Sequence, residues 1–191
     1  MRYDKRHSKK TRARIVNVAA RHLREHGIES ASIKNVMRDA GLTHGGFYSH
    51  FPSKESLVIQ ALIHAFEEVE CLLRRAGERG GIAGIVQHYL QQPRSGANQG
   101  GCPLVALASD IARQSNEVRA AAANEIETYL GVMAQHIGDT DRQFARTRAT
   151  QIFSLMMGAV QLACLASNEG LATQTLEAAA DAAKILSSHK L

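Results

Sequence analysis

The spacing of the apolar residues limits the fold of this chain more than any other feature. Apolar side chains recur every three or four residues, so that they gather on one face of a helix. In residues 9–26 that face consists of Ile15, Val18, Ala19 and Leu23. No stretch shows the sustained alternation of a half-buried strand, and 191 residues contain only three prolines. The sequence therefore predicts an all-α protein.

Capping residues and glycines divide this pattern into about nine helices. Ser32, Thr43 and Ser53 are typical N-cap residues, while Gly27 and Gly41 are typical stops. The short turn that contains Gly41 joins the second and third helices as a helix-turn-helix. The expected helices cover residues 9–26, 33–40, 43–51, 53–76, 82–91, 104–137 with a break at 115–116, 140–167 and 171–188, with a loop over 92–101.

Charge is distributed unevenly between the front and the back of the chain. Residues 1–60 contain 12 Lys/Arg and 5 Asp/Glu, whereas the remaining residues contain 11 and 13. This asymmetry indicates a polyanionic partner for the front part only. A solvated basic tail would fit the charges equally well, so charge alone leaves both interpretations open.

Two adjacent glycines, Gly45 and Gly46, lie in the first turn of the short helix over residues 43–51. Glycine is about 1 kcal/mol less favourable than alanine inside a helix. We infer that this helix lies close against a large polar partner, and that side chains at these positions would be in the way.

Cysteine usage and hydropathy restrict the compartment. Cys71, Cys102 and Cys164 are odd in number and form no CxxC pair, which argues against a disulfide framework or a zinc site. The apolar stretch 152–167 is shorter than a membrane span, and the first residues lack the apolar run of a signal peptide. We therefore expect a cytoplasmic protein with no membrane partner.

The stretch from Ala40 to Glu55 reads Ala-Gly-Leu-Thr-x-Gly-x-Phe-Tyr-x-His-Phe-x-Ser-Lys-Glu. With the apolar positions before it, this segment resembles the N-terminal DNA-binding domain of TetR-family transcriptional regulators, without a gap over residues 9–58. The rest of the chain fits that family in length and helicity, but without an equally specific motif. The resemblance implies a DNA-binding regulator with no enzymatic activity, no metal and no cofactor. It implies two domains: residues 1–55, a helix-turn-helix domain with a basic N-terminal arm, and residues 56–191, a helical ligand-binding and dimerisation domain.

The resemblance also implies which residues meet double-stranded DNA. A recognition helix presents its N-terminal residues to base edges in the major groove. His44 and Ser49 are the candidates for reading bases, and Gly45 and Gly46 would let the backbone approach the DNA. The family commonly has Thr or Ala at the position of Gly46, so one contact is expected to be missing here. The candidates for phosphate or groove-edge contacts are Ser32, Lys34, Thr43, Tyr48, His50 and Lys54, whereas Phe47 and Phe51 are expected to point inward.

His22-Leu-Arg-Glu-His26 matches the H-x-x-E-H signature of inverted zinc hydrolases. His22 and His26 share a helical face and could hold Zn²⁺, with Glu25 nearby as a base. However, Gly27 ends the helix at once and no third ligand is evident. A chance match is the better interpretation.

In the family that the front part resembles, the back part forms a ligand cavity and a two-fold dimer interface. Apolar residues in 152–167 occur on more than one helical face, which is typical of a helix buried on two sides. We therefore expect a homodimer through the last two helices. The candidate ligand-binding residues, each also compatible with a simple core role, are Phe66, His88, Tyr89, Cys102, Tyr129, Met133, Phe153, Met156 and Gln161.

Gly101-Cys102-Pro103 resembles a segment of one branch of TetR-like regulators, some of which respond to electrophiles or oxidants. Proline suits the first position of a helix, which would place Cys102 at the helix N-terminus. There the helix dipole would lower the thiol pKa and raise its reactivity. The alternative is a small buried residue.

These expectations describe a ligand-responsive repressor that binds an inverted-repeat operator as a homodimer and releases it when an inducer binds. Two alternatives stay open: a thiol-based redox or electrophile sensor that uses Cys102, and a DNA-packaging protein indifferent to sequence. No pattern identifies the inducer or the operator, or distinguishes repression from activation.

Overall fold

The computed structural model describes residues 5–91, 101–138 and 141–188, and these ranges are helical without any strand. None of the helices in them combines the length and the apolar character that a membrane-spanning segment needs. The predicted all-α fold is confirmed, and eight helices take the place of the nine expected. They are α1 (Lys5–Ser30), α2 (Ile33–Asp39), the 3₁₀ helix η1 (His44–Ser49), α3 (Lys54–Leu90), α4 (Pro103–Ala112), α5 (Asn116–Gln135), α6 (Arg142–Leu165) and α7 (Glu169–Ser188).

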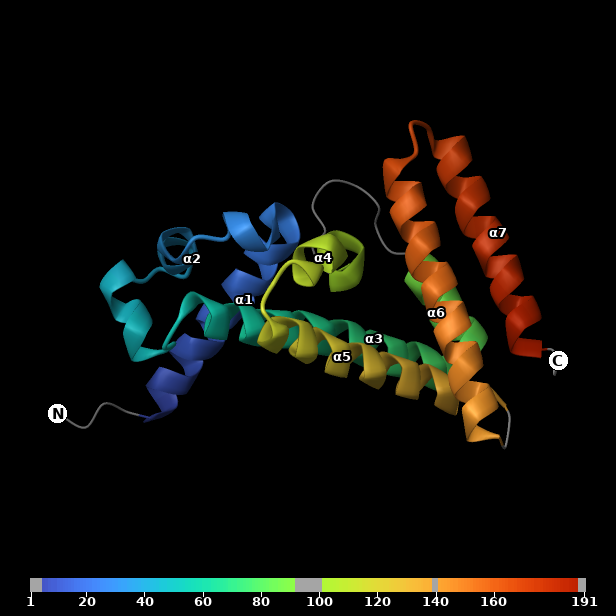
Figure 1. The fold of residues 1–191 in the computed structure, drawn as a ribbon, viewed down its shortest axis with the longest axis horizontal. Coiled ribbons are helices and arrows are strands. Elements are labelled where there is room, and N and C mark those ends of the chain that lie inside the picture. Colours follow the sequence, from blue (N-terminus) through green and yellow to red (C-terminus); the bar gives the residue numbers. More distant parts are fainter. Residues whose placement is uncertain (1–4, 92–100, 139–140, 189–191) are drawn as a thin grey trace.

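The helices form an elongated molecule around α3 (Figure 1). At one end α1, α2 and η1 form a small cluster, in which α1 packs against the first half of α3. In the middle α3 and α5 run side by side along the long axis, and at the other end α6 and α7 pair with each other. The short helix α4 contacts α1, α5 and α6, so it lies between the front cluster and the back helices.

Caps predicted from the sequence start α2 and α3. The Ser32 hydroxyl accepts a hydrogen bond from the Asn35 amide at 3.1 Å, and the Ser53 hydroxyl accepts one from the Ser56 amide at 3.0 Å. Gly41, at φ 67°, turns the chain between α2 and η1. These local signals place the helix-turn-helix where the sequence predicts it.

The third helix differs from its prediction. An α-helix was expected over residues 43–51, but the structure has a six-residue 3₁₀ helix, and Thr43 makes no side-chain cap. The amide of Gly46 donates to the carbonyl of Thr43, and the amide of His50 donates to that of Phe47, so these bonds span three residues. Tight i→i+3 geometry of this kind is typical of short helical pieces.

Helix α3 is also longer than predicted. It continues past residue 76 to Leu90, with a break at Gly80 and Gly81, where φ is −145° and 60°. Glycine adopts the positive φ without strain, so the two helices expected over 53–76 and 82–91 follow each other directly. The expected domain boundary after residue 55 stays a prediction, and α3 crosses it. Residues 92–100 of the predicted loop lie outside the described residues.

The end of α1 is closed by a side chain from α4. Gly27 has φ 80° and ψ 169°, so the helix breaks where the sequence predicts a stop. The Ile28 amide after this break donates to Oδ2 of Asp110 at 3.0 Å. Next to it, the side-chain amide of Gln114 donates from Nε2 to Oε1 of Glu29 at 3.1 Å. The front cluster is thus joined to α4 by polar contacts as well as by packing.

We expect Gly27→Ala to lower the free energy of unfolding by about 1 to 3 kcal/mol. Alanine is strained at a positive φ, and its methyl carbon would stand 2.6 Å from Asp110 Oδ2, which must then move away from the Ile28 amide. Urea denaturation measures the change. Gly131→Ala in α5 is the matched control, since its methyl group would meet nothing within 4 Å. Equal stability of Gly27→Ala and wild type would contradict the role of this contact.

Candidate nucleic-acid interface

Two phenylalanines anchor η1 to the front cluster. Phe47 and Phe51 are buried, as expected, and their rings stack at 5.7 Å between centroids. The Arg12 guanidinium lies 4.5 Å from the centre of the Phe51 ring and donates to Oε1 of Gln60 at 3.3 Å. Arg12 therefore fastens α1 to η1 and α3.

The outer side of η1 is a row of accessible side chains: His44, Gly45, Tyr48 and Ser49 are exposed. Tyr48 keeps 65% of its surface accessible, although a ring of this size is normally half-buried or more. The Ser49 hydroxyl donates to the carbonyl of Gly46 at 2.7 Å. Buried phenylalanines therefore hold one side of η1 against the front cluster, while its exposed polar residues face the solvent.

Neither glycine of η1 is required by the fold. Gly45 and Gly46 have ordinary negative φ, unlike Gly27, Gly41 and Gly81. A methyl group on Gly45 would meet nothing within 4 Å, and one on Gly46 would make ordinary contacts with Thr43 Oγ1 and Met37 Cε at 3.7 and 3.9 Å. Neither the backbone conformation nor the packing of the single chain therefore requires a glycine at these two positions.

The remaining interface candidates lie around η1, in α2 and at the start of α3 (Figure 1). Lys34 and Thr43 are exposed, and His50 is half-buried. The ammonium group of Lys54 donates to the carbonyl of Glu29 at 3.2 Å and keeps further N–H donors for another partner. The Ser32 hydroxyl serves as acceptor in the α2 cap, so its own proton remains available.

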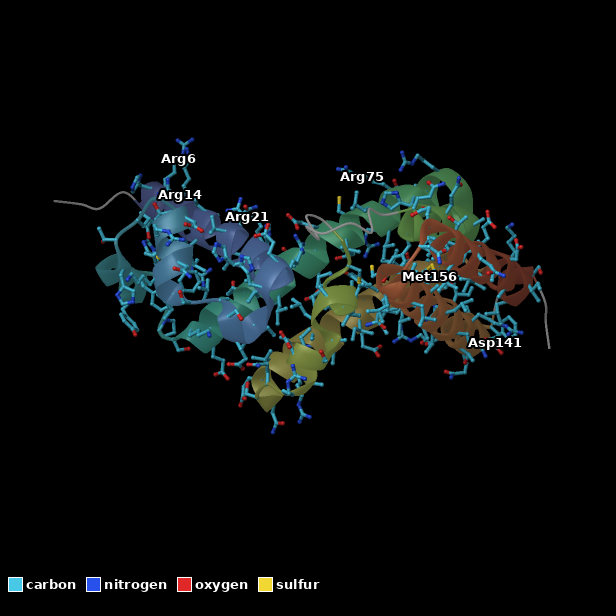
Figure 2. The ribbon with its side chains drawn as sticks, turned by 90° about the horizontal axis from the view of Figure 1, so that it is seen from above. Arg6, Arg14, Arg21, Arg75, Asp141 and Met156 are labelled. Atoms are coloured by element: carbon cyan, nitrogen blue, oxygen red, sulfur yellow. The ribbon has the colours of Figure 1, made fainter. Side chains whose placement is uncertain are left out.

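Positive side chains continue along α1. Figure 2 shows Arg6, Arg14 and Arg21 along one side of this helix, and Arg14 and Arg21 are both exposed. Spaced seven residues apart, these two share a helical face. The basic composition of the front part is therefore displayed on its surface.

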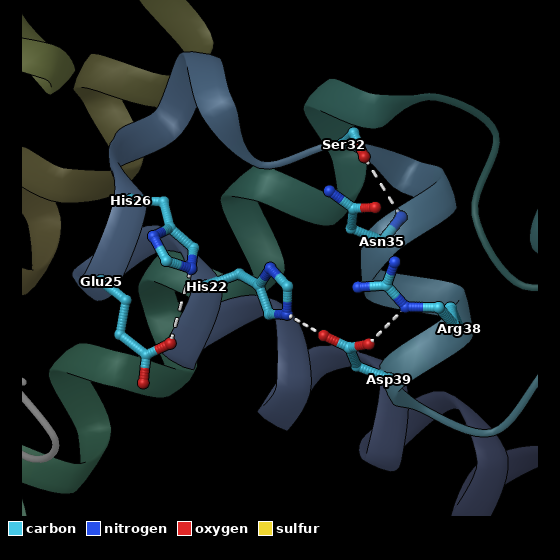
Figure 3. A network of polar contacts seen from close by, with 7 residues as sticks. All are labelled: His22, Glu25, His26, Ser32, Asn35, Arg38 and Asp39. Carbon is cyan, nitrogen blue, oxygen red and sulfur yellow. Dashed lines mark hydrogen bonds and ion pairs between the residues drawn. The ribbon is translucent and has the colours of Figure 1, made fainter.

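A polar network that the sequence did not reveal clamps α1 to α2 (Figure 3). Nε2 of the buried His22 lies 2.8 Å from Oδ2 of Asp39, and the histidine donates because an ionised carboxylate only accepts. Arg38 donates to the other oxygen at 2.9 Å. The hydrogen bond from Arg38, followed by the one from His22, holds the pKa of Asp39 below its usual value.

The H-x-x-E-H stretch is used by this network. His22 faces Asp39, while His26 lies 3.7 Å from Glu25 and edge-on to the ring of His22. Among the described residues, no three His, Cys, Asp or Glu side chains are grouped as a metal ion would need. The match to a hydrolase signature therefore reflects the packing of α1 on α2.

Most of the ligand-binding candidates form one buried cluster in the back part. The rings of Phe66 and Tyr129 lie 5.5 Å apart, those of Tyr129 and Phe153 5.8 Å, and those of Phe153 and Tyr89 6.0 Å. The Tyr129 hydroxyl donates to the carbonyl of Phe66 at 2.9 Å. Met133 and Met156 are fully buried as well, and His88 is half-buried. Gln161 is separate from the cluster and borders a surface hollow beside Val105.

Cys102 occupies the position that the sequence predicts, at the N-cap of α4 with Pro103 behind it. The expectation of a lowered thiol pKa is wrong. Cys102 is 3% exposed, and burial raises its pKa, although Tyr89 and the amides of Leu104 and Val105 act in the opposite direction. The loss of hydration outweighs the helix terminus, so the thiol is a small buried group in this conformation.

A groove of about 600 Å³, which was not predicted from the sequence, lies between the last turns of α3 and the length of α7. Its walls are mainly aliphatic, with Ile82, Val86 and Leu90 on α3 and Leu176, Ala180 and Ala183 on α7. None of the nine ligand-binding candidates lines it.

Family models match both parts of the chain. Residues 15–61 match the model described as bacterial regulatory proteins, tetR family. Residues 78–182 match the model described as a tetracyclin repressor-like C-terminal domain. The first match covers α2, η1 and parts of α1 and α3, and the second reaches from the end of α3 into α7.

Individual proteins agree with these matches. An uncharacterized HTH-type transcriptional regulator of Mycobacterium tuberculosis is 29% identical over 114 residues, which is 58% of this chain and 58% of that relative. A TetR transcriptional regulator from Chloroflexus aurantiacus is 26% identical with a TM-score of 0.75, covering 96% of this chain and 95% of that one. A TetR-family regulator from Cytophaga hutchinsonii shares the fold, with 20% identity, a TM-score of 0.80 and coverage of 96% and 98%.

Asp39→Asn should destabilise the protein at neutral pH and flatten its acid dependence. Because the folded-state pKa of Asp39 is lowered from 3.8, its carboxylate contributes stability that is present above the unfolded pKa and is lost as the pH falls through the lower folded value. The difference in Tm between variant and wild type should therefore shrink as the pH falls from about 6 to about 3. Thermal unfolding over this range tests it. Asp181→Asn, which removes a surface ion pair with Lys184, is the control; a difference for Asp39→Asn that stays constant with pH would contradict the network.

Proposed function

Because the chain belongs to the tetR family of bacterial regulatory proteins, we propose that it is a ligand-responsive repressor that binds an inverted-repeat operator as a homodimer. Family membership makes it a DNA-binding transcriptional regulator and not an enzyme. We propose residues 1–55 as the DNA-binding domain and residues 56–191 as the ligand-binding and dimerisation domain. We propose a cytoplasmic location, where its DNA target would be.

The two glycines of η1 are the observation that carries this proposal. Gly45 and Gly46 cost helix stability and nothing within the chain needs them, whereas a recognition helix gains from backbone that comes close to the DNA. His44 and Ser49 beside them would read base edges. The residues around them would contact phosphates or the edges of the groove: Ser32, Lys34, Thr43, Tyr48, His50 and Lys54.

Exposed apolar residues on α6 and α7 support the dimer. Leu162 and Leu165 on α6 are 62% and 83% exposed, and Leu171 and Ile185 on α7 are 50% and 60% exposed. Within one subunit these large apolar side chains stay exposed, and exposed apolar surface on two paired helices supports an interaction site there. A two-fold pairing of α6 and α7 would bury them. It would also set two η1 segments at half-sites about 34–36 Å apart, or a multiple of that.

Release of the operator requires a ligand that prefers a conformation in which the two η1 segments no longer match the half-sites. Helix α3 runs from the front cluster into the back part, and Asp110 joins α4 to α1, so both elements would transmit a rearrangement. The buried candidates Phe66, Tyr89, Tyr129, Met133, Phe153 and Met156 would bind a ligand only after their cluster repacks. The alternative of a sensor based on Cys102 has less support, since that thiol is buried and its pKa is raised.

Gly45→Ala should weaken operator binding without weakening the fold. An operator is first selected from random DNA with the wild-type protein, and its affinity is then measured for the variant by fluorescence anisotropy. We expect a loss of about tenfold or more, equal to about 1.4 kcal/mol, because the new methyl group stands between backbone and DNA. Urea stability should rise by up to about 1 kcal/mol.

Gly131→Ala is the matched control for this experiment. It adds the same methyl group to α5, where nothing lies within 4 Å, so operator affinity should stay unchanged. Operator binding by Gly45→Ala at wild-type strength would contradict the assignment of η1 as the recognition segment.

Leu165→Glu should convert the dimer to monomers. A carboxylate placed at this exposed position leaves the single subunit intact but would have to be buried in the pairing of α6 and α7. Sedimentation at micromolar concentration should show one subunit, and binding to the full operator should fall while the Tm of the isolated subunit is preserved. Ala123→Glu, on the exposed side of α5, should remain dimeric. A dimer that survives Leu165→Glu would refute this interface.

A further inference from the structure

The groove between α3 and α7 has the size and the walls of a small-molecule site. Its volume of about 600 Å³ falls within the range of roughly 300–1,000 Å³ that is usual for ligand pockets. Aliphatic side chains from two helices form its walls, and the amides of Gln87 and Gln91 lie among them. Apolar walls with a few polar groups are the usual composition of such a site.

The groove faces away from the proposed dimer interface. On α7, Thr173, Ala180 and Ser187 line the groove and follow one another at seven-residue spacing, so they form one stripe. Leu171 and Ile185 belong to a second stripe, displaced by two residues, which is about 200° around a helix of 3.6 residues per turn. Pairing through the second stripe therefore leaves the groove open.

The charges in the groove favour a cation. Among the described residues, two charged side chains line it, Glu177 and Lys184, and the ammonium group of Lys184 is engaged at 2.8 Å by Asp181, outside the groove. Within the described ranges of the chain, Glu177 takes part in no ion pair. A carboxylate that has no ion pair among the described residues, beside aliphatic walls, matches a molecule that carries a positive charge on an apolar body.

We propose that this groove binds a lipophilic organic cation, such as a hydrophobic amine or quaternary ammonium compound. Resting on the proposed function, the same class of molecule is then the inducer. The aliphatic walls take up the apolar body, Glu177 faces the charge, and Gln87 and Gln91 hydrogen-bond to polar substituents.

The position of the groove connects it with the DNA-binding end. Its α3 wall begins at Ile82, directly after the break at Gly80 and Gly81. The same helix begins at Lys54, which is bound to the end of α1. A ligand that favours one angle at this break shifts the population of conformations by its difference in affinity for them.

Rhodamine 6G, a fluorescent lipophilic cation, and anilinonaphthalene sulfonate, a lipophilic anion, are titrated into the full-length protein without DNA. Rhodamine should bind saturably with one molecule per subunit. Glu177→Gln should weaken it by about two- to fivefold, as expected for an exposed charge pair, and this difference should vanish in high salt. The same variant should bind the sulfonate more tightly, whereas Glu117→Gln on α5 should change neither.

Ala83→Trp tests the location. Ala83 lines the groove and is exposed, so the indole fills the cavity from its rim without entering the core. Rhodamine binding should fall at least about tenfold, equal to about 1.4 kcal/mol. Ala123→Trp on α5 should leave it unchanged. Rhodamine binding that survives Ala83→Trp would place the site elsewhere, and tighter binding of the sulfonate than of rhodamine to wild type would overturn the ligand class.

Adding rhodamine to the complex with the selected operator then tests whether binding in the groove also releases the DNA. Release of DNA by wild type but not by Ala83→Trp supports the inducer role. Binding in the groove without release overturns that role and leaves the site standing. If the protein binds no operator at all, the proposed function fails, yet the titrations without DNA still decide whether the groove is a cation site.

Discussion

The burial of one side of α3 is the constraint on which the rest of the structure depends. Leu62, Phe66, Val69 and Leu73 are completely covered by α1 and by the back helices, and this apolar stripe runs from the helix-turn-helix to the groove. Apolar area removed from water contributes about 25 cal/mol per Å², which far exceeds what caps or surface ion pairs add. Because both ends of the molecule are packed onto the same helix, the recognition segment and the back helices hold a defined relation to each other.

Local signals in the sequence were sufficient for most of the helix starts and stops. These signals act through cap hydrogen bonds or backbone angles within a few residues, at Ser32, Ser53, Gly27 and Pro103. Their roles can therefore be predicted without the tertiary structure. The continuity of α3 was harder to anticipate, since Gly80 and Gly81 interrupt the helical conformation at the expected place but do not separate two helices in space. The 3₁₀ geometry of η1 also went unforeseen, because helix periodicity and caps in the sequence do not separate it from a short α-helix.

The candidate site also contains parts that the sequence predicted and parts that it did not. The exposed side of η1 was predictable because a dense motif and two adjacent glycines mark it in the sequence itself. For Cys102 the sequence left open a reactive thiol with a lowered pKa or a small buried residue, because its burial depends on helices that are distant in the chain. The groove was missed for a related reason: the stripe of Thr173, Ala180 and Ser187 is ordinary for a surface helix until the end of α3 is placed opposite it.

The carboxylate of Asp110 has a consequence for biosynthesis. The recognition residues leave the ribosome early, but the Ile28 amide at the end of α1 finds its protein acceptor only 82 positions later in the chain. Until then α1 is held by apolar packing and by polar contacts within the front part, such as the one between His22 and Asp39. Closing a loop of this length has an entropic cost that the formation of local helices does not have. The hydrogen bond that closes the end of α1 can therefore form only after the chain has been made as far as Asp110 in α4.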